Sequence, residues 1–103
     1  MPFEAAVFAA LGDETRLALI EQLQSGSASI VSLTDDAGMS RQAVTKHLHV
    51  LEKAGLVTRR HIGRTTVWQL ERPRLDEARH YLDIISKQWD GALERLRTHV
   101  EDH

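Results

Sequence analysis

The sequence predicts a mostly helical fold in which five helices accompany one β-hairpin. Three patterns lead to it: apolar residues recur at helical spacing over most of the chain, two β-branched segments flank a glycine, and the final quarter repeats apolar residues in steps of three and four. The chain has 103 residues, of which 42% are apolar and 27% charged. Such a composition is typical of one soluble domain, expected to span residues 1–103.

The first two helices are expected on either side of Gly12. Residues 3–11 are mostly apolar, and Asp13 is a favourable N-cap for the second helix, which ends in a Ser-Gly-Ser segment at 25–27. The expected inward positions of this second helix are Leu17, Ile20 and Leu23, with Leu19 beside them.

A short helix over about 30–37 is followed by a Gly-Met-Ser turn and a longer helix with Ser40 as its N-cap. Gly55 marks the end of this longer helix. Two helices joined in this way form a helix-turn-helix, and we call the second one, with its cap at 39–54, the recognition helix. Its inner stripe recurs at i, i+4 and i+7 and consists of Val44, Leu48 and Leu51.

Residues 56–70 are expected to form a β-hairpin directly after the recognition helix. Segments 56–60 and 65–70 are rich in β-branched and aromatic residues, and His-Ile-Gly-Arg at 61–64 forms the expected loop. A hairpin in this position is a wing, so the fold class is a winged helix-turn-helix.

The last helix is expected at about 74–100, opened by Pro73. A helix of about 27 residues is about 40 Å long, more than a domain of this size covers easily, which predicts pairing with a second copy. Its apolar residues repeat over three heptads as a coiled-coil seam, and these are Leu75, Ala78, Leu82, Ile85, Trp89, Ala92 and Leu96.

The net charge of −2 is unevenly distributed along the chain. Residues 38–64 carry six basic residues against one acidic residue, a net +5, whereas 1–37 carry −5 and 65–103 carry −2. Because salt screens charges beyond about 10 Å, a local basic block matters more to a polyanion than the total charge. The recognition helix and wing are therefore expected to face nucleic acid.

The exposed side of the recognition helix carries side chains suited to duplex DNA. Arg41 and Gln42 can make paired hydrogen bonds to guanine and adenine in the major groove. Thr45 can contact a phosphate or a thymine methyl group, Lys46 suits a phosphate or guanine, and Ser40 adds a phosphate donor at the helix N-terminus. The alternative for this group is an ordinary solvated helix face.

Arg60 and Arg64 are the expected DNA contacts of the wing. Because side chains alternate along a strand, Arg59 and Arg60 face opposite sides, and the sequence leaves open which of them faces DNA. These charges could instead protect a strand edge against aggregation. His47 either contacts a phosphate or packs between helices, and the sequence does not decide between the two.

Three segments make the chain resemble the ArsR/SmtB family of winged helix-turn-helix repressors: FAALGDETRL at 8–17, SRQAVTKHL at 40–48 and LEKAGLV at 51–57. The resemblance covers nearly the whole chain. It implies a homodimer built from the first and last helices, which binds an inverted repeat near its own promoter and releases it on a signal. The residues expected at the dimer interface are Phe8, Leu82, Ile85, Trp89 and Leu96.

The chain departs from the metal-sensing members of that family because it has no cysteine, which excludes thiolate metal sites and disulfides. His80 and His99 are too far apart to match the closer-spaced ligands of the last helix. His99 with His103, and Asp76 with His80, have a spacing that zinc can use, but an exposed polar surface explains them as well. The resemblance is therefore to a cysteine-free, non-metal-sensing subgroup, with no metal site and no cofactor.

Other function classes receive less support. The chain has no Gly-rich phosphate loop and no HExxH or GxSxG motif, which argues against an enzyme. It has no apolar run of about 18 residues and no basic start typical of a signal peptide, so we expect no membrane contact and a cytoplasmic location. The remaining alternative is a winged-helix protein–protein interaction module without DNA binding, against which Arg41, Gln42 and Lys46 argue.

Overall fold

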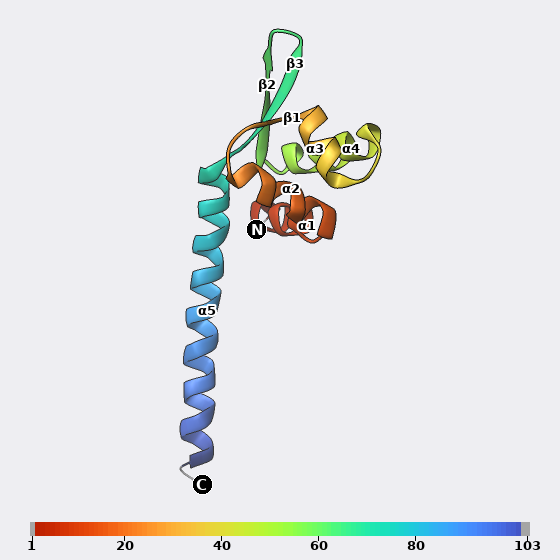
Figure 1. The fold of residues 1–103 in the computed structure, drawn as a ribbon. Coiled ribbons are helices and arrows are strands. Elements are labelled where there is room, and N and C mark those ends of the chain that lie inside the picture. The colour runs from red at the N-terminus through yellow and green to blue at the C-terminus, as the bar shows by residue number, and fades with distance from the viewer. Residues whose placement is uncertain (1, 102–103) are drawn as a thin grey trace.

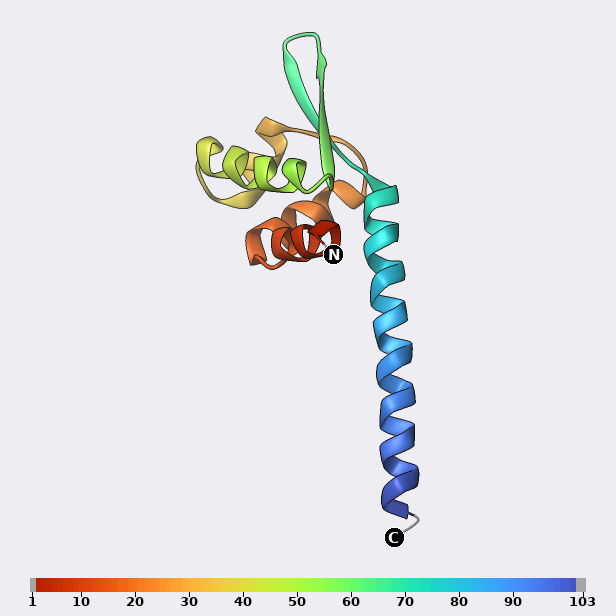
Figure 2. The same cartoon turned by 180° about the vertical axis from the view of Figure 1, so that it is seen from behind.

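The fold is that of a computed structural model, which describes residues 2–101 and the side chains of residues 5–101. Four helices form a head, from which a β-hairpin and a long fifth helix extend in opposite directions (Figures 1 and 2). The molecule measures 68 × 25 × 24 Å. The helices are α1 (Pro2–Leu11), α2 (Glu14–Gln24), α3 (Ile30–Ala37), α4 (Arg41–Lys53) and α5 (Arg72–Glu101). The strands are β1 (Ala28–Ser29), β2 (Val57–Ile62) and β3 (Thr65–Leu70). The predicted fold class, five helices with a hairpin wing, is confirmed.

Side-chain caps begin α2 and α4 where the sequence predicts them. The carboxylate of Asp13 accepts a hydrogen bond from the backbone N–H of Arg16 at 3.0 Å, and the Ser40 hydroxyl accepts one from Ala43 at 3.1 Å. Ser29 caps α3 in the same way, accepting from Ser32 at 3.1 Å. These bonds satisfy N–H groups that the first turn of a helix leaves open, so they fix where each helix starts.

Helix α4 ends in a Schellman motif centred on Gly55, which has a φ of +78°. The N–H of Leu56 donates to the carbonyl of Leu51 at 3.0 Å, and that of Gly55 donates to Glu52 at 2.9 Å. Leu51 and Leu56 are both fully buried, as the motif's apolar contact requires. The motif therefore fixes the direction in which the wing leaves the recognition helix.

The sheet has three antiparallel strands in the order β1-β3-β2, and β1 pairs Ala28 with Trp68. The sequence did not predict β1, because two residues are too few for a detectable alternation. Strand β2 runs through Ile62 rather than ending at residue 60, since Gly63 and Arg64 alone make the turn. Gly63 has a φ of +63°, and no residue other than glycine has a positive φ within the described chain, which fits a type II′ hairpin turn.

The hydrophobic core joins the head to the base of the wing and to the first turns of α5. Leu17 is 45% exposed, contrary to its expected inward position, whereas Leu19 is 1% exposed. The reason is that the buried side of α2 is the one that carries Leu19, Ile20 and Leu23, and Leu17 lies outside it. The largest fully buried side chains are Trp68, Leu19, Leu23, Leu33, Leu48, Leu51, Leu56, Val7, Val44 and Val57.

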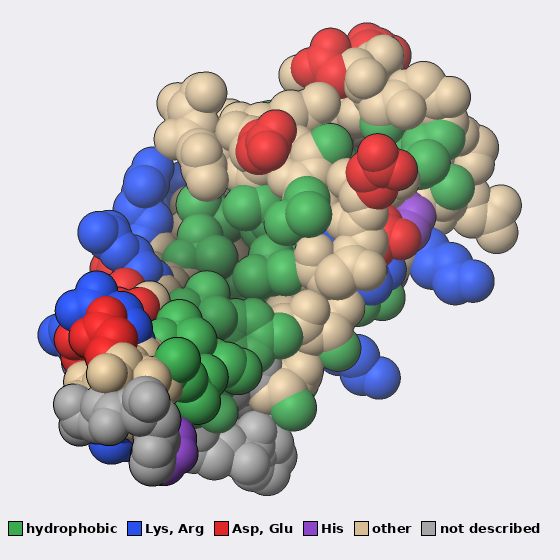
Figure 3. Space-filling view, turned by 90° about the horizontal axis from the view of Figure 1, so that it is seen from below, with side chains coloured by type: hydrophobic (Ala, Val, Ile, Leu, Met, Phe, Trp, Pro, Cys, Tyr) green, Lys and Arg blue, Asp and Glu red, His purple; other side chains and the backbone are tan. Residues whose placement is uncertain are grey.

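Helix α5 begins at Arg72, two residues before the predicted start. The carbonyl of Glu71 accepts from the N–H groups of Arg74 and Leu75 at 3.2 and 3.4 Å, and proline is tolerated in a first helical turn. Ala78 is the one residue of the described α5 that is buried. Apolar side chains gather on the side of α5 turned toward the head (Figure 3). No helix within residues 2–101 is long and apolar enough to cross a membrane.

Candidate nucleic-acid interface

The rotation of α4 is set by its buried stripe. Val44 and Leu48 are fully buried beneath the helix, so Gln42 and Lys46, on other sides of the helix, are exposed and Thr45 is half-buried. Apolar burial thus determines which side chains of α4 are available to a partner.

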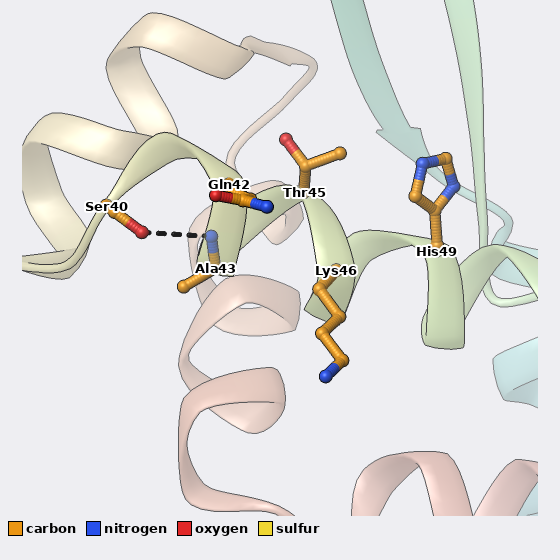
Figure 4. A pocket seen from close by; sticks show the side chains of 6 residues that line it. All are labelled: Ser40, Gln42, Ala43, Thr45, Lys46 and His49. Atoms are coloured by element: carbon orange, nitrogen blue, oxygen red, sulfur yellow. Dashed lines mark hydrogen bonds between the residues drawn. The ribbon is translucent and has the colours of Figure 1, made fainter.

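Four of the predicted DNA-contacting residues line one shallow hollow on the outer side of α4. These are Ser40, Gln42, Thr45 and Lys46, and the hollow has a volume of about 580 Å³. Thr45 projects to one side of the helix and Lys46 extends to the opposite edge (Figure 4). Donors and acceptors therefore lie across the width of α4, as a helix in a DNA groove requires.

His49 also lines this hollow, although the sequence analysis did not select it. Its side chain projects to the same side of α4 as that of Thr45 (Figure 4), and its Nδ1 lies 3.3 Å from Oε1 of Glu52. Gln42, Thr45 and His49 follow the i, i+3, i+7 spacing of one helix face, and this spacing could have identified His49.

Arg41 lies apart from that group, in a second hollow of about 150 Å³ between α4 and the wing. Its companions there include Thr45, from α4, and Arg59 and Thr66, from the wing. Recognition helix and wing therefore meet at a shared, positively charged recess, which the sequence analysis did not predict.

His47 packs against α2 rather than facing the outer hollow. Its Nδ1 lies 3.4 Å from Nη1 of Arg16 and 3.8 Å from Oδ2 of Asp13, with the His47 side chain 25% exposed. Arg16 in turn donates through Nε to the carbonyl of Ala10 at 2.6 Å. This geometry favours the alternative in which His47 joins helices over the one in which it contacts phosphate.

The pKa of Asp13 is lowered from its ordinary value. The first cause is the hydrogen bond that its carboxylate accepts from the backbone N–H of Arg16, and the positive charges of Arg16 and His47 add to it. The ionised carboxylate therefore caps the start of α2 and lies beside His47, in the middle of α4.

The two neighbouring arginines of β2 face different surroundings. Arg59 lies across from Trp68, with its guanidinium carbon 5.7 Å from the ring centroid and its Nε 3.2 Å from Oε2 of Glu52. Arg60 lies across from Val67, is exposed, and forms no ion pair with any residue that the structure describes. Arg64 is likewise exposed, at the turn of the wing.

No three His, Asp or Glu side chains converge as a possible metal site in the described part of the chain. His103, which the sequence analysis paired with His99, lies outside the described residues.

The residues predicted for the dimer interface lie in two places. Phe8 of α1 is half-buried, with its ring centroid 5.9 Å from that of Tyr81 on α5. Leu82, Trp89 and Leu96 are 52, 63 and 59% exposed along α5. Ile85, between them, is half-buried. The single chain thus leaves most of the α5 seam uncovered.

Comparison with known proteins identifies the same helix-turn-helix. A helix-turn-helix domain family matches residues 11–60. The chain is 40% identical over 84 residues to the HTH-type transcriptional regulator Rv2034 of Mycobacterium tuberculosis, covering 82% of this chain and 76% of Rv2034. It is 30% identical over 82 residues to the HTH-type transcriptional regulator MJ1325 of Methanocaldococcus jannaschii, covering 79% of this chain and 92% of MJ1325.

Solved structures share the whole architecture. An ArsR-like transcriptional regulator from Rhodococcus sp. RHA1 superimposes with a TM-score of 0.82 and 34% identity, over 94% of this chain and 92% of its own. Mb0332 of Mycobacterium bovis, described as a homodimeric winged helix-turn-helix DNA-binding domain, shares the fold with a TM-score of 0.67 and 21% identity, over 91% of this chain and 84% of its own. The chain therefore belongs to the ArsR family of winged helix-turn-helix regulators, DNA-binding transcription factors that are not enzymes.

Proposed function

We propose that this regulator is a homodimeric repressor that binds an inverted-repeat operator in the cytoplasm. The observation that carries the proposal is the exposed surface of α4. Gln42, Thr45 and Lys46 on its outer side, and Arg41 beside the wing, make no hydrogen bond or ion pair through their side chains with residues 2–101. Side chains with unused donors on an exposed helix are available to base edges and phosphates.

The direct contacts follow from the chemistry of each side chain. Gln42 pairs with adenine, Arg41 with guanine or a phosphate, and Thr45 and Lys46 with the sugar-phosphate backbone or a base edge. Arg60 and Arg64 extend the positive surface along the wing, where arginine is favoured by the negative potential of a narrow minor groove. The same exposed donors make a protein–protein module without DNA binding the weaker alternative.

The dimer is supported by the exposed seam of α5. Leu82, Trp89 and Leu96 would expose large apolar surface to water in a lone chain, whereas a second α5 would cover them. The homodimeric state described for Mb0332, which has the same fold, agrees with this arrangement. A two-fold axis would present the two α4 helices to successive major grooves about 34 Å apart, which is why the operator should be an inverted repeat.

The first test is to sequence fragments that the protein selects from randomised duplex DNA, with and without added zinc. A repressor of this kind should select two symmetric half-sites whose centres are one helical turn apart, with or without the metal. Placing the selected site over a promoter should then lower transcription when the protein is added, because a bound dimer excludes polymerase. Selection of no sequence would contradict the proposal.

The second test replaces Gln42 with alanine. We expect binding to weaken by about 1–3 kcal/mol and the preference at one base position of each half-site to relax. Gln24→Ala, at an exposed glutamine near the end of α2, is the matched control and should leave binding unchanged. Equal weakening on all sequences would show that Gln42 contacts only the backbone.

A further inference from the structure

The recess between the recognition helix and the wing has the properties of an anion site. It is a hollow of about 150 Å³ lined by Ile30, Arg41, Thr45, Arg59, Thr66 and Trp68. We propose that this hollow binds one phosphate group, supplied by the DNA backbone where the duplex passes from α4 to the wing. The backbone as the source rests on the proposed DNA binding, and inorganic phosphate is the other source of the same chemistry.

Four hydrogen-bonding side chains from three elements converge on the hollow. Arg41 and Thr45 come from α4, and neither side chain has a partner within the described chain. Arg59 and Thr66 come from β2 and β3, and among the described residues the Thr66 hydroxyl has one hydrogen-bond partner, Nδ1 of His61 at 3.4 Å. Two guanidinium groups and two hydroxyls offer donors to the several acceptor oxygens of a phosphate, and Arg41 adds a positive charge that no carboxylate of the described residues pairs with.

Arg59 is held in position before any ligand arrives. Its Nε lies 3.2 Å from Glu52, and its guanidinium carbon lies 5.7 Å from the centroid of the Trp68 ring. These contacts leave its terminal Nη groups for an anion. The carboxylate of Glu52, which is not part of the lining, is balanced by Arg59 and approached by His49 Nδ1 at 3.3 Å. The Arg59 side chain is 46% exposed, and these two contacts restrict its rotamers, so binding loses less of its conformational entropy than binding by an unpaired arginine.

Trp68 provides a spectroscopic reporter in the wall of the hollow. Its side chain is 1% exposed and forms part of the wall of the hollow, yet its Nε1 has no hydrogen-bond partner in the described chain. A buried N–H group without an acceptor is unfavourable, so such groups are rare in folded proteins. The indole ring that carries this N–H forms part of the wall of the hollow, so its NMR signal can report what binds there.

The position of the hollow favours the DNA backbone as the source of the phosphate. A recognition helix lies in the major groove, and a wing reaches the backbone or the adjacent minor groove. The phosphates of one strand separate these two grooves, so a strand must pass between α4 and the wing. Contacts to phosphate there would fix the register of α4 without reading sequence.

The first experiment uses inorganic phosphate and the indole N–H signals of the protein in ¹H–¹⁵N NMR spectra. We expect the Trp68 signal to shift saturably with phosphate but not with sodium chloride at equal ionic strength. The Trp89 signal, from the exposed far part of α5, is the internal control. Thr66→Val should raise the dissociation constant for phosphate about tenfold, since it removes one hydrogen bond to a charged group.

Thr65→Val is the matched control, because neighbouring residues of a strand face opposite sides and Thr65 does not line the hollow. It should bind phosphate as the unmodified protein does. Unchanged thermal unfolding of both variants would show that the loss in Thr66→Val is not a loss of folding.

The second experiment replaces single phosphates of the selected duplex with uncharged methylphosphonates. The unmodified protein should lose about tenfold in affinity at one linkage per half-site. Arg59→Gln and Thr66→Val should lose nothing further at that linkage, whereas Thr65→Val should lose as much as the unmodified protein. Non-additivity of this kind shows that the side chain and the phosphate act together.

The outcomes separate this inference from the proposed function. A Trp68 shift without any coupled linkage would support a phosphate site filled by the free anion. A coupled linkage, with or without the shift, would support the backbone as the source. If no duplex binds, the proposed function fails, but the indole titration still shows whether the hollow binds phosphate. Absence of both the shift and a coupled linkage would overturn the inference.

Discussion

Gln42 and His47 belong to the same helix, yet the fold gives them different surroundings. Gln42 lines the outer hollow of α4, and His47 lies against Arg16 and Asp13 of the neighbouring segment. The difference follows from rotation about the axis of α4, because Leu48 beside His47 is fully buried. We therefore expect residues of the first kind to affect DNA binding and residues of the second kind to affect stability.

Asp13→Asn should change how stability depends on acid. The folded-state pKa of Asp13 is below its ordinary value of 3.8, so the ionised carboxylate stabilises the fold above pH 3.8. This contribution disappears as the pH falls through the folded-state pKa. Asparagine also caps helices but does not titrate.

Denaturant unfolding from pH 7 to pH 3 measures this effect. The unmodified protein should be the more stable at pH 7, and the difference should shrink below about pH 4. Gln24→Ala, a change at an exposed residue without a titratable group, is the control and should show no such trend. A difference that stays constant over the whole range would contradict the assigned role of Asp13.

Arg64→Ala tests whether the turn of the wing contacts a DNA phosphate. Each phosphate contact that is lost should reduce the slope of log affinity against log salt concentration by about 0.9. Arg64 is exposed at the turn next to Gly63, so its removal should leave folding unchanged. An unaltered slope in DNA binding measured from 50 to 200 mM salt would exclude a contact between this side chain and the backbone.

At the scale of elements, the connection from α4 to the wing depends on one backbone conformation. Gly55 has a φ of +78°, which an L-residue adopts at a cost of about 1–2 kcal/mol. A Cβ there would also lie 2.5 Å from Nε of Arg74, although that flexible side chain can move. We expect Gly55→Ala to lower the free energy of unfolding by about 1–2 kcal/mol.

Gly91→Ala is the informative comparison because Gly91 lies inside α5 without a positive φ. A Cβ at this position meets Nη1 of Arg95 at 3.4 Å, an ordinary contact. Alanine should raise the free energy of unfolding by about 0.5–1 kcal/mol, since it reduces the freedom of the unfolded chain. If the two variants change thermal stability in the same direction, the positive φ of Gly55 is not what makes glycine favourable there.

At the scale of the whole molecule, α5 extends away from a head that covers only its first turns. Trp89 is 63% exposed, and replacing it with glutamate should not disturb the fold of one chain. In the proposed dimer, it would place two charges in an apolar interface and raise the dissociation constant about a hundredfold. Sedimentation velocity at micromolar concentration should then show monomers.

Val31→Glu is the matched control for this change. Val31 is 56% exposed, on α3, and lies away from the α5 seam, so this variant should remain dimeric. A stable dimer of Trp89→Glu would show that the chains pair through another surface. Loss of tight operator binding together with dimerisation would connect the two halves of the proposed function.

The sequence by itself determined the features that depend on neighbours along the chain. Asp13 and Ser40 cap their helices, Gly55 ends the recognition helix, and the buried stripe of α4 sets its exposed side. These features follow from local rules of spacing and backbone conformation, so the amino-acid sequence alone is enough to predict them. The resemblance to the ArsR family, confirmed by the comparisons, depends on the same segments.

Only the tertiary structure decided what depends on partners distant in sequence. It placed His47 on Arg16, paired Arg59 with Glu52 while leaving Arg60 exposed, and added β1 beside Trp68. The recess between α4 and the wing also joins residues from separate elements. Such contacts arise from how elements pack together, and spacing within one element carries no information about which distant side chain will lie beside it.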